Sequence, residues 1–284
     1  MILMKTKTII LASMAWLMAA CAEDVERPAQ DYLNRAQAAY SSKQYHTAKL
    51  QIDSIKTMHP KAFETRKQAQ ALLLQVELAE SMDNKAYTDS LLQDLRHRIA
   101  PLTEKLYLDK DTRYQETGNY YAASHRIEKH IGRSYLRPQV DERGRHSITV
   151  FNRGKAIAAH LLRFTADDGT FVEVAATEQP YVTSDATGRT ERVDFVPNPI
   201  GAVGSFVKLH GNKKIKVELI GDKGKATIPF ANNDAAAMTD VYELATLLTT
   251  VGELEKQQQE LERRIEFFTK RIQADSSTPN TSEP

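Results

Sequence analysis

Apolar residues recur at helical spacing in the first third of the chain. Between residues 28 and 80, alanine, leucine, isoleucine and tyrosine side chains fall three or four positions apart, which is the period of an amphipathic helix. A polar break at residues 41–44 separates two helices, and a third begins near Ala62. The pattern therefore predicts an N-terminal helical hairpin followed by a third helix.

Two further segments show the heptad spacing of coiled coils. The first seam consists of Leu92, Leu95, Ile99, Leu102 and Leu106. The second consists of Val241, Leu244, Leu248, Val251, Leu254, Gln258, Leu261, Ile265, Phe268 and Ile272, with a phase shift at Gly252. We expect Pro101 to kink the first helix or divide it in two.

The two seams are similar in length, about 40 Å each at a rise of about 1.5 Å per residue. They predict a long antiparallel coiled-coil-like stalk formed by residues 84–108 and 244–272. The alternative is that residues 240–273 pair with a second copy and form a homodimer.

Between the seams the apolar period changes from 3.6 to 2. Expected strands are 133–140, 146–151, 160–165, 170–175, 205–209, 215–220 and 226–230, and residues 176–204 are expected to form a long loop. The turns Asp141–Gly144, Asp167–Gly169 and Gly221–Gly224 are typical of hairpins. The predicted fold class is α+β, with a small antiparallel β domain, a sandwich or an open barrel, inserted between helices.

The expected domain organisation follows from these patterns. It comprises a leader (1–20), an acidic tether (21–30), a helical region with the first stalk helix (31–111), a β domain (112–231), a C-terminal stalk helix (235–273) and a disordered tail (274–284).

The leader has a basic, then apolar, then small-residue order. Lys5 and Lys7 precede the apolar run Ile9–Met18, and Ala19-Ala20 stand before Cys21, the only cysteine of the chain. This arrangement resembles the lipobox of bacterial lipoproteins, although Met18 stands where that family usually has leucine. The resemblance implies cleavage before Cys21, lipidation (palmitate among the chains) at its thiol and acylation of its new amine.

The residues after Cys21 indicate the membrane to which such a lipoprotein would be sorted. Ala22 is not the aspartate that retains enteric lipoproteins in the inner membrane, so the resemblance implies the outer membrane. Glu23, Asp24 and Glu26 also resemble the acidic signal of surface-exposed Bacteroidetes lipoproteins. A plain solvated tether is the alternative, and the periplasmic face and the cell surface both stay open.

The sequence of the first helical hairpin also resembles a known repeat. From Ala36 to Ala48 the sequence follows the pattern A-x-x-A-Y-x-x-x-x-Y-x-x-A, with Pro60 after the second helix. This resembles a tetratricopeptide repeat (TPR), a module of outer-membrane lipoproteins in assembly and nutrient-uptake machines. A plain amphipathic hairpin is the alternative, because only one repeat is visible.

Composition narrows the function classes. Removing residues 1–20 takes away two lysines and no acid, so the formal charge changes from +1 to −1. This balance argues against a nucleic-acid partner. With Cys21 lipidated no thiol remains, which excludes cysteine hydrolases, CxxC oxidoreductases and thiolate zinc sites.

Candidate chemistry is sparse, and we assign no catalytic residue, cofactor or metal ligand. His125 and His130 fit no metal motif, and Gly221–Thr227 fits a hairpin turn better than a phosphate loop. The strongest binding candidate is a tyrosine cluster that could contact carbohydrate or protein, with internal packing as the alternative. It consists of Tyr107, Tyr114, Tyr120, Tyr121 and Tyr135.

These observations predict a lipid-anchored cell-envelope protein with a non-enzymatic binding, structural or assembly role. Its expected partners are the membrane, through Cys21, and a protein or envelope polymer. The alternatives are an envelope glycan-processing enzyme and a surface nutrient-binding lipoprotein.

Overall fold

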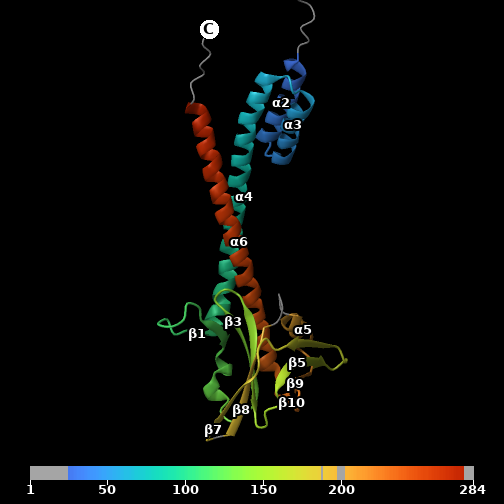
Figure 1. Cartoon of the computed structure of the whole chain (residues 1–284), viewed down its shortest axis with the longest axis vertical. Helices are drawn as coiled ribbons and strands as arrows, with labels where there is room; N and C mark the ends of the chain where they lie inside the picture. The colour runs from blue at the N-terminus through green and yellow to red at the C-terminus, as the bar shows by residue number, and fades with distance from the viewer. Residues whose placement is uncertain (1–24, 187, 197–201, 278–284) are drawn as a thin grey trace, which may run out of the picture. The chain divides into compact units, whose positions relative to one another are not determined.

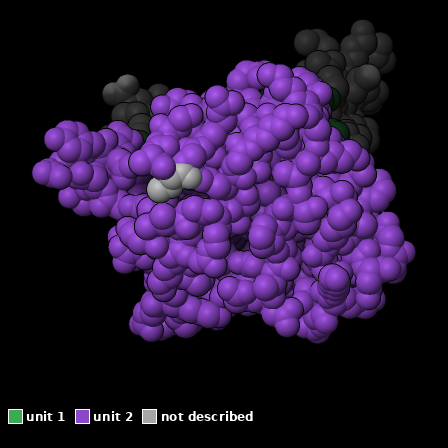
Figure 2. Space-filling model, turned by 90° about the horizontal axis from the view of Figure 1, so that it is seen from below, with its two compact units in different colours: residues 1–87, 258–284 green, residues 88–257 purple. Residues whose placement is uncertain are grey.

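The computed structural model describes residues 25–186, 188–196 and 202–277 (Figure 1). The predicted leader, Cys21 and residues 278–284 lie outside this described part. The described chain is α+β, as predicted, with antiparallel pairing throughout its two sheets. It forms two compact units: unit 1 contains residues 1–87 and 258–284, and unit 2 contains residues 88–257 (Figure 2).

Unit 1 is helical. It contains α2 (Glu26–Ser41), α3 (Tyr45–Met58), the first part of α4 (Phe63–Lys105) and the last part of α6 (Asn232–Ser277). Its core consists of small and aliphatic side chains at the predicted helical spacing: Ala29, Leu33, Ala36, Ala39, Ala48, Ile52, Ile55, Ala62, Ala69, Leu72 and Val76. The many alanines of this core allow the helices to approach closely.

The predicted tether is shorter than expected, because α2 already begins at Glu26. Pro28 does not prevent this, since the first turn of a helix has no use for its missing N–H. Glu26 accepts hydrogen bonds from the Thr65 backbone N–H (3.1 Å) and hydroxyl (2.7 Å), which fixes the start of α2 against α4. These bonds lower the pKa of Glu26.

Of the two expected effects of Pro101, a kink or a division of the helix, the division is wrong. Helix α4 continues through this residue as one 43-residue helix and ends at Lys105. One backbone hydrogen bond is lost there, but Ile99 and Leu102 pack on both sides of the proline. Residues 106–109, expected to be helical, instead form strand β1 (Leu106–Asp109).

The side chains of both heptad seams are shielded from solvent. Every seam position in α4 and α6 is buried or half-buried, including Leu92, Leu95, Leu244 and Leu261, each at most 8% exposed. Helix α6 also passes Gly252 without a break and extends to Ser277, so the expected tail from residue 274 begins as helix.

Unit 2 contains two antiparallel sheets. The six-stranded sheet has the order β1-β2-β3-β4-β8-β7, and the four-stranded sheet has the order β10-β9-β5-β6. The strands after β1 are β2 (Asn119–Ala122), β3 (Tyr135–Asp141), β4 (His146–Arg153), β5 (Ala159–Ala166), β6 (Phe171–Ala175), β7 (Tyr181–Asp185), β8 (Gly188–Phe195), β9 (Ile215–Gly221) and β10 (Gly224–Ile228). Two short 3₁₀ turns, η1 (Ala123–His125) and η2 (Ile127–Lys129), follow β2.

Two expectations in this region are wrong. The long loop expected over residues 176–204 contains the β7–β8 hairpin. The strand expected at 205–209 is part of helix α5 (Ala202–His210), whose Val203 and Val207 are buried four positions apart. Short apolar runs fit either structure, and the contact of α5 with the core decides this one.

The two sheets share one core, which makes unit 2 a sandwich closed by α5 and the start of α6. Both sheets contribute fully buried side chains, such as Ile148 and Phe195 from one and Leu162 and Phe164 from the other. Val207 and Met238 add the two helices. In the part of the chain that the structure describes, no helix is long and apolar enough to span a membrane.

Candidate ligand-binding site

The outer face of the six-stranded sheet carries aromatic and cationic side chains. On β3, Leu136 and Val140 point to buried clusters, so Tyr135, Arg137 and Gln139 project from the opposite face. Strand register places Tyr135 beside Phe151 and Phe151 beside Arg192. Three residues distant in sequence therefore form one row across the sheet.

This face is hollowed next to η1 and η2. The resulting pocket, about 320 Å³ in volume, is called here the arginine–tyrosine pocket. It is lined by Tyr107, Asp109, Tyr121, Arg126, Ile127, Glu128, Arg137, Phe151 and Arg192.

Aromatic rings form the pocket's floor and continue beyond it. Tyr107 and Tyr121 meet edge to face, with centroids 5.5 Å apart. Phe151 stacks on Tyr135 at 4.6 Å, and Tyr135 stacks on His130 at 4.1 Å. The floor therefore offers flat apolar surface of the kind on which sugar rings and planar groups stack.

The three arginines of the pocket differ in their partners. Arg126 contacts Glu128 at 3.5 Å, and Arg192 contacts Asp194 at 3.0 Å. Arg137 makes no carboxylate contact among the described residues; its guanidinium lies 4.7 Å from the Tyr121 ring centroid and 5.6 Å from that of Phe151.

The outward row of β3 is short of hydrogen-bond partners. The Tyr135 hydroxyl, Arg137 Nε and Gln139 Oε1 are all buried and have no partner among the described residues. Such groups are uncommon in folded proteins, because a buried polar atom without a partner costs about 1–3 kcal/mol. Of these three residues, Arg137 is the one that lines the arginine–tyrosine pocket.

Two tyrosines of this face, Tyr121 and Tyr135, have raised pKa values. Burial, followed by the hydrogen bond to Asp109, raises the pKa of Tyr121 to about 12. Its hydroxyl donates to Asp109 Oδ2 at 2.9 Å. Burial also raises the pKa of Tyr135. Neither phenol is therefore ionised under ordinary conditions.

The predicted tyrosine cluster is only partly brought together. Tyr107, Tyr121 and Tyr135 lie on this outer face. Tyr120 lies on the opposite face of β2, against the core formed with α6, and Tyr114 is 81% exposed in the β1–β2 loop.

The two candidate histidines approach each other but have structural partners. His125 and His130 have centroids 5.9 Å apart. His125, only 1% exposed, contacts Asp234 at 2.9 Å and Ser124 at 3.0 Å, which ties η1 to the first turn of α6. Among the described residues, no group of three or more His, Cys, Asp or Glu side chains could hold a metal ion.

Sequence reasoning missed the cationic half of the pocket. Arg137 lies in β3, Arg192 in β8 and Arg126 between η1 and η2. Only strand register and the η1–η2 segment bring the three together. The alternation of outward residues on β3 is a usable signal, but the sequence pattern does not predict the β8 strand that supplies Arg192.

No family model matches the chain, and no curated protein or solved structure matches it either.

Proposed function

We propose that the chain is a lipid-anchored cell-envelope protein of the outer membrane with a non-enzymatic role. Cys21 would hold it to the membrane, and the arginine–tyrosine pocket of unit 2 would bind an anionic envelope polymer. The leader and Cys21 support the first part, and the geometry of the pocket supports the second.

One observation carries the binding proposal: Arg137 is a cation held between two rings without a carboxylate partner among the described residues. A guanidinium forms bidentate hydrogen bonds with carboxylate or phosphate groups. The contacts with the Tyr121 and Phe151 rings hold this cation beside the aromatic floor of the pocket. A polymer that bears acidic groups on sugar rings would use both the cation and the aromatic floor.

We also propose that α4 and α6 form an antiparallel stalk and that α2 and α3 form a TPR-like hairpin on it. In unit 1, Arg264 contacts Glu77 at 2.7 Å. In unit 2, Arg96 contacts Glu255 at 3.2 Å, and Lys105 contacts Asp240 at 2.6 Å. In unit 2 the later residue of α4 therefore pairs with the earlier residue of α6, which is the order expected for antiparallel helices.

Glycan hydrolysis is the second candidate, because the pocket contains two carboxylates, Asp109 and Glu128. Both already contact donors of the pocket, Tyr121 and Arg126 respectively. We favour binding for this reason. Release of reducing sugar by the wild type, lost in both Asp109→Asn and Glu128→Gln, would instead favour the enzyme.

The anchor is tested by replacing Cys21. In membranes of the producing bacterium, we expect the wild type to carry acyl chains detectable by mass spectrometry at the residue 21 peptide. Cys21→Ser should carry no acyl chain and should be released into the soluble fraction by a high-salt wash. Recovery of an unacylated wild type would contradict the anchor.

The pocket is tested with an acidic polysaccharide, polygalacturonate, and a neutral one, dextran. We expect the wild type to bind only polygalacturonate in affinity electrophoresis, and Arg137→Gln to lose at least tenfold in affinity. Arg113→Gln is the matched control, because Arg113 also lies over a tyrosine, Tyr114, but outside the pocket. Equal losses in the two variants would contradict a role for the pocket.

A further inference from the structure

Three helix termini meet at one end of unit 1. Glu26, in the first turn of α2, accepts hydrogen bonds from the Glu64 and Thr65 backbone N–H groups at the start of α4. The end of α3 is at the same place, since Tyr32 contacts Met58 through its hydroxyl and His59 through its ring. We call this region, residues 56–67 with the start of α2, the proximal end.

The opposite end of the α2–α3 pair is well separated from it. There, Lys43 in the α2–α3 turn and Tyr45 at the start of α3 contact Asp83 of α4. Thr65 and Asp83 are 18 positions apart on α4, which corresponds to about 27 Å of helix. The proximal end is therefore a defined face of unit 1.

The proximal end combines exposed apolar and cationic side chains. Met58 is 61% and Phe63 is 70% exposed, which is unusual for side chains of this size. Lys56, Lys61 and Lys67 are exposed around them, and no ion pair is found for these three lysines among the described residues.

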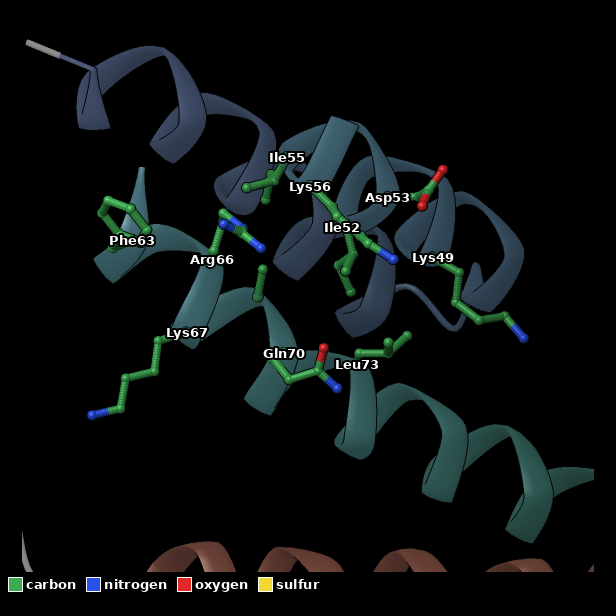
Figure 3. Close-up of a pocket in the computed structure, with 11 residues that line it drawn as sticks. Lys49, Ile52, Asp53, Ile55, Lys56, Phe63, Arg66, Lys67, Gln70 and Leu73 are labelled. Atoms are coloured by element: carbon green, nitrogen blue, oxygen red, sulfur yellow. The ribbon is translucent and has the colours of Figure 1, made fainter. Parts of the chain in front are cut away.

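A groove runs from this end along α3 and α4 (Figure 3). Its volume is about 600 Å³, and Ile52, Ile55 and Leu73 give it an apolar floor. Lys56, Phe63, Arg66 and Lys67 line it toward the proximal end, whereas Asp53 is its acidic side chain. Within the proximal end itself, five cations (Arg27, Lys56, Lys61, Arg66 and Lys67) outnumber two acids (Glu26 and Glu64).

The lipid attachment site is close to this end along the chain. Five residue steps separate Cys21 from Glu26, and even a fully extended chain of that length spans only about 18 Å. A lipid on Cys21 would therefore keep the proximal end, rather than the end at Asp83, next to the bilayer.

We infer that the proximal end is a membrane-contact surface that binds the phosphate groups of an anionic leaflet. This inference rests on the proposed lipidation of Cys21. Lysines near an anionic surface and a phenylalanine at the headgroup level are the two features that interfacial proteins combine with lipid chains. The surface would orient unit 1 on the bilayer, in addition to the anchor that retains it.

The test uses the mature chain without its lipid, residues 21–284 carrying Cys21→Ser. Sedimentation with vesicles of phosphatidylglycerol and phosphatidylcholine measures binding, and pure phosphatidylcholine vesicles measure the neutral background. We expect binding to the anionic vesicles that weakens steeply with salt. The triple variant Lys56→Glu, Lys61→Glu and Lys67→Glu should lose at least tenfold, and Phe63→Ser several-fold.

The matched control reverses three exposed lysines of unit 2, Lys155→Glu, Lys214→Glu and Lys223→Glu, for the same change in net charge. It should retain most of the binding, and circular dichroism should show all variants folded. Equal losses in both triple variants, or no preference of the parent chain for anionic vesicles, would overturn the inference. Binding of soluble polyglutamate without vesicle binding would overturn it in favour of an acidic protein partner.

The two proposals fail separately. An unacylated Cys21 in the producing bacterium contradicts the anchor, whatever the vesicles show. Absent vesicle binding with an acylated Cys21 contradicts only the membrane-contact surface.

Discussion

Glu191 is a charged residue at a core-facing position of β8, and it is fully buried. Its carboxylate accepts hydrogen bonds from the Asn152 side chain (3.1 Å) and from the Ile157 (3.0 Å) and Ala159 (3.1 Å) backbone N–H groups. Between these two amides, Ala158 has a positive φ of 53°. Glu191 thus holds the strained connection between β4 and β5.

We expect Glu191→Leu to lower the free energy of unfolding by about 3 kcal/mol, because it leaves three buried donors without an acceptor. Glu191→Gln, which keeps one carbonyl acceptor, should lose less. Urea denaturation measures both. Glu116→Leu is the control, since the Glu116 side chain is 87% exposed. Equal stability of the Glu191 and Glu116 variants would argue against this role.

His146 is a second polar residue whose burial costs free energy of folding. It is 8% exposed, and neither ring nitrogen has a hydrogen-bond partner among the described residues. Burial lowers its pKa from 6.5 to about 4. The folded state therefore resists the protonation that the unfolded chain accepts.

The unfolded state binds more protons than the folded state between pH 6.5 and about 4, so stability should fall as the pH is lowered through this range. The full effect is about 3 kcal/mol at about 1.36 kcal/mol per pKa unit. His146→Leu should remove this contribution between pH 5 and 6.5, where carboxylates of ordinary pKa are mostly ionised. Urea unfolding across this interval would detect it, and an unchanged slope in the variant would contradict it.

At the scale of elements, a hairpin turn can require glycine both for its backbone conformation and for its packing against a neighbouring helix. The β3–β4 turn ends at Gly144, with a φ of +85°. A Cβ atom there would lie 2.6 Å from Thr249 Oγ1 and 2.7 Å from its backbone N, on α6. The glycine therefore serves both the turn and the approach of the hairpin to the helix.

Gly169, in the β5–β6 turn, provides a comparison, because its φ is +84° but a Cβ atom there would meet no neighbouring atom within 4 Å. We expect Gly169→Ala to cost about 1–2 kcal/mol, from backbone conformation alone. Gly144→Ala should cost clearly more, because Thr249 must move. Thermal unfolding of the two variants measures the difference, and equal losses would show that α6 does not constrain the turn.

The elements differ in how well the sequence predicts them. The seam positions within α4 and α6 are predicted well because they share one requirement, burial on one helix face, whereas Leu106 of the first seam lies in β1. Strand β8 is not predicted, because Glu191 occupies an inward position at which the strand pattern requires an apolar residue. Helix α5 is not predicted because a nine-residue apolar segment fits either the helical or the strand period. Its Gly204 is required because a Cβ atom there would clash with the Tyr242 ring, a contact that only the structure reveals.

At the scale of the whole molecule, the main alternative concerns α6. Val241, Leu244 and Leu261 are each at most 5% exposed within a single chain. A homodimer through residues 240–273 would need these same side chains. We therefore expect the mature chain with Cys21→Ser to sediment as a monomer across a wide concentration range. A stable dimer at low concentration would contradict the proposed intramolecular stalk.

The sequence by itself determined the class of the fold, most of the helices and hairpins, and the prediction of a lipid anchor at Cys21. These depend on local periods, turn residues and a contiguous motif, all of which are readable along the chain. Only the tertiary structure decided that Tyr121, Arg137, Phe151 and Arg192 form one pocket and that three helix termini meet at the proximal end. Such sites depend on strand register and helix packing, which join residues that no local pattern connects.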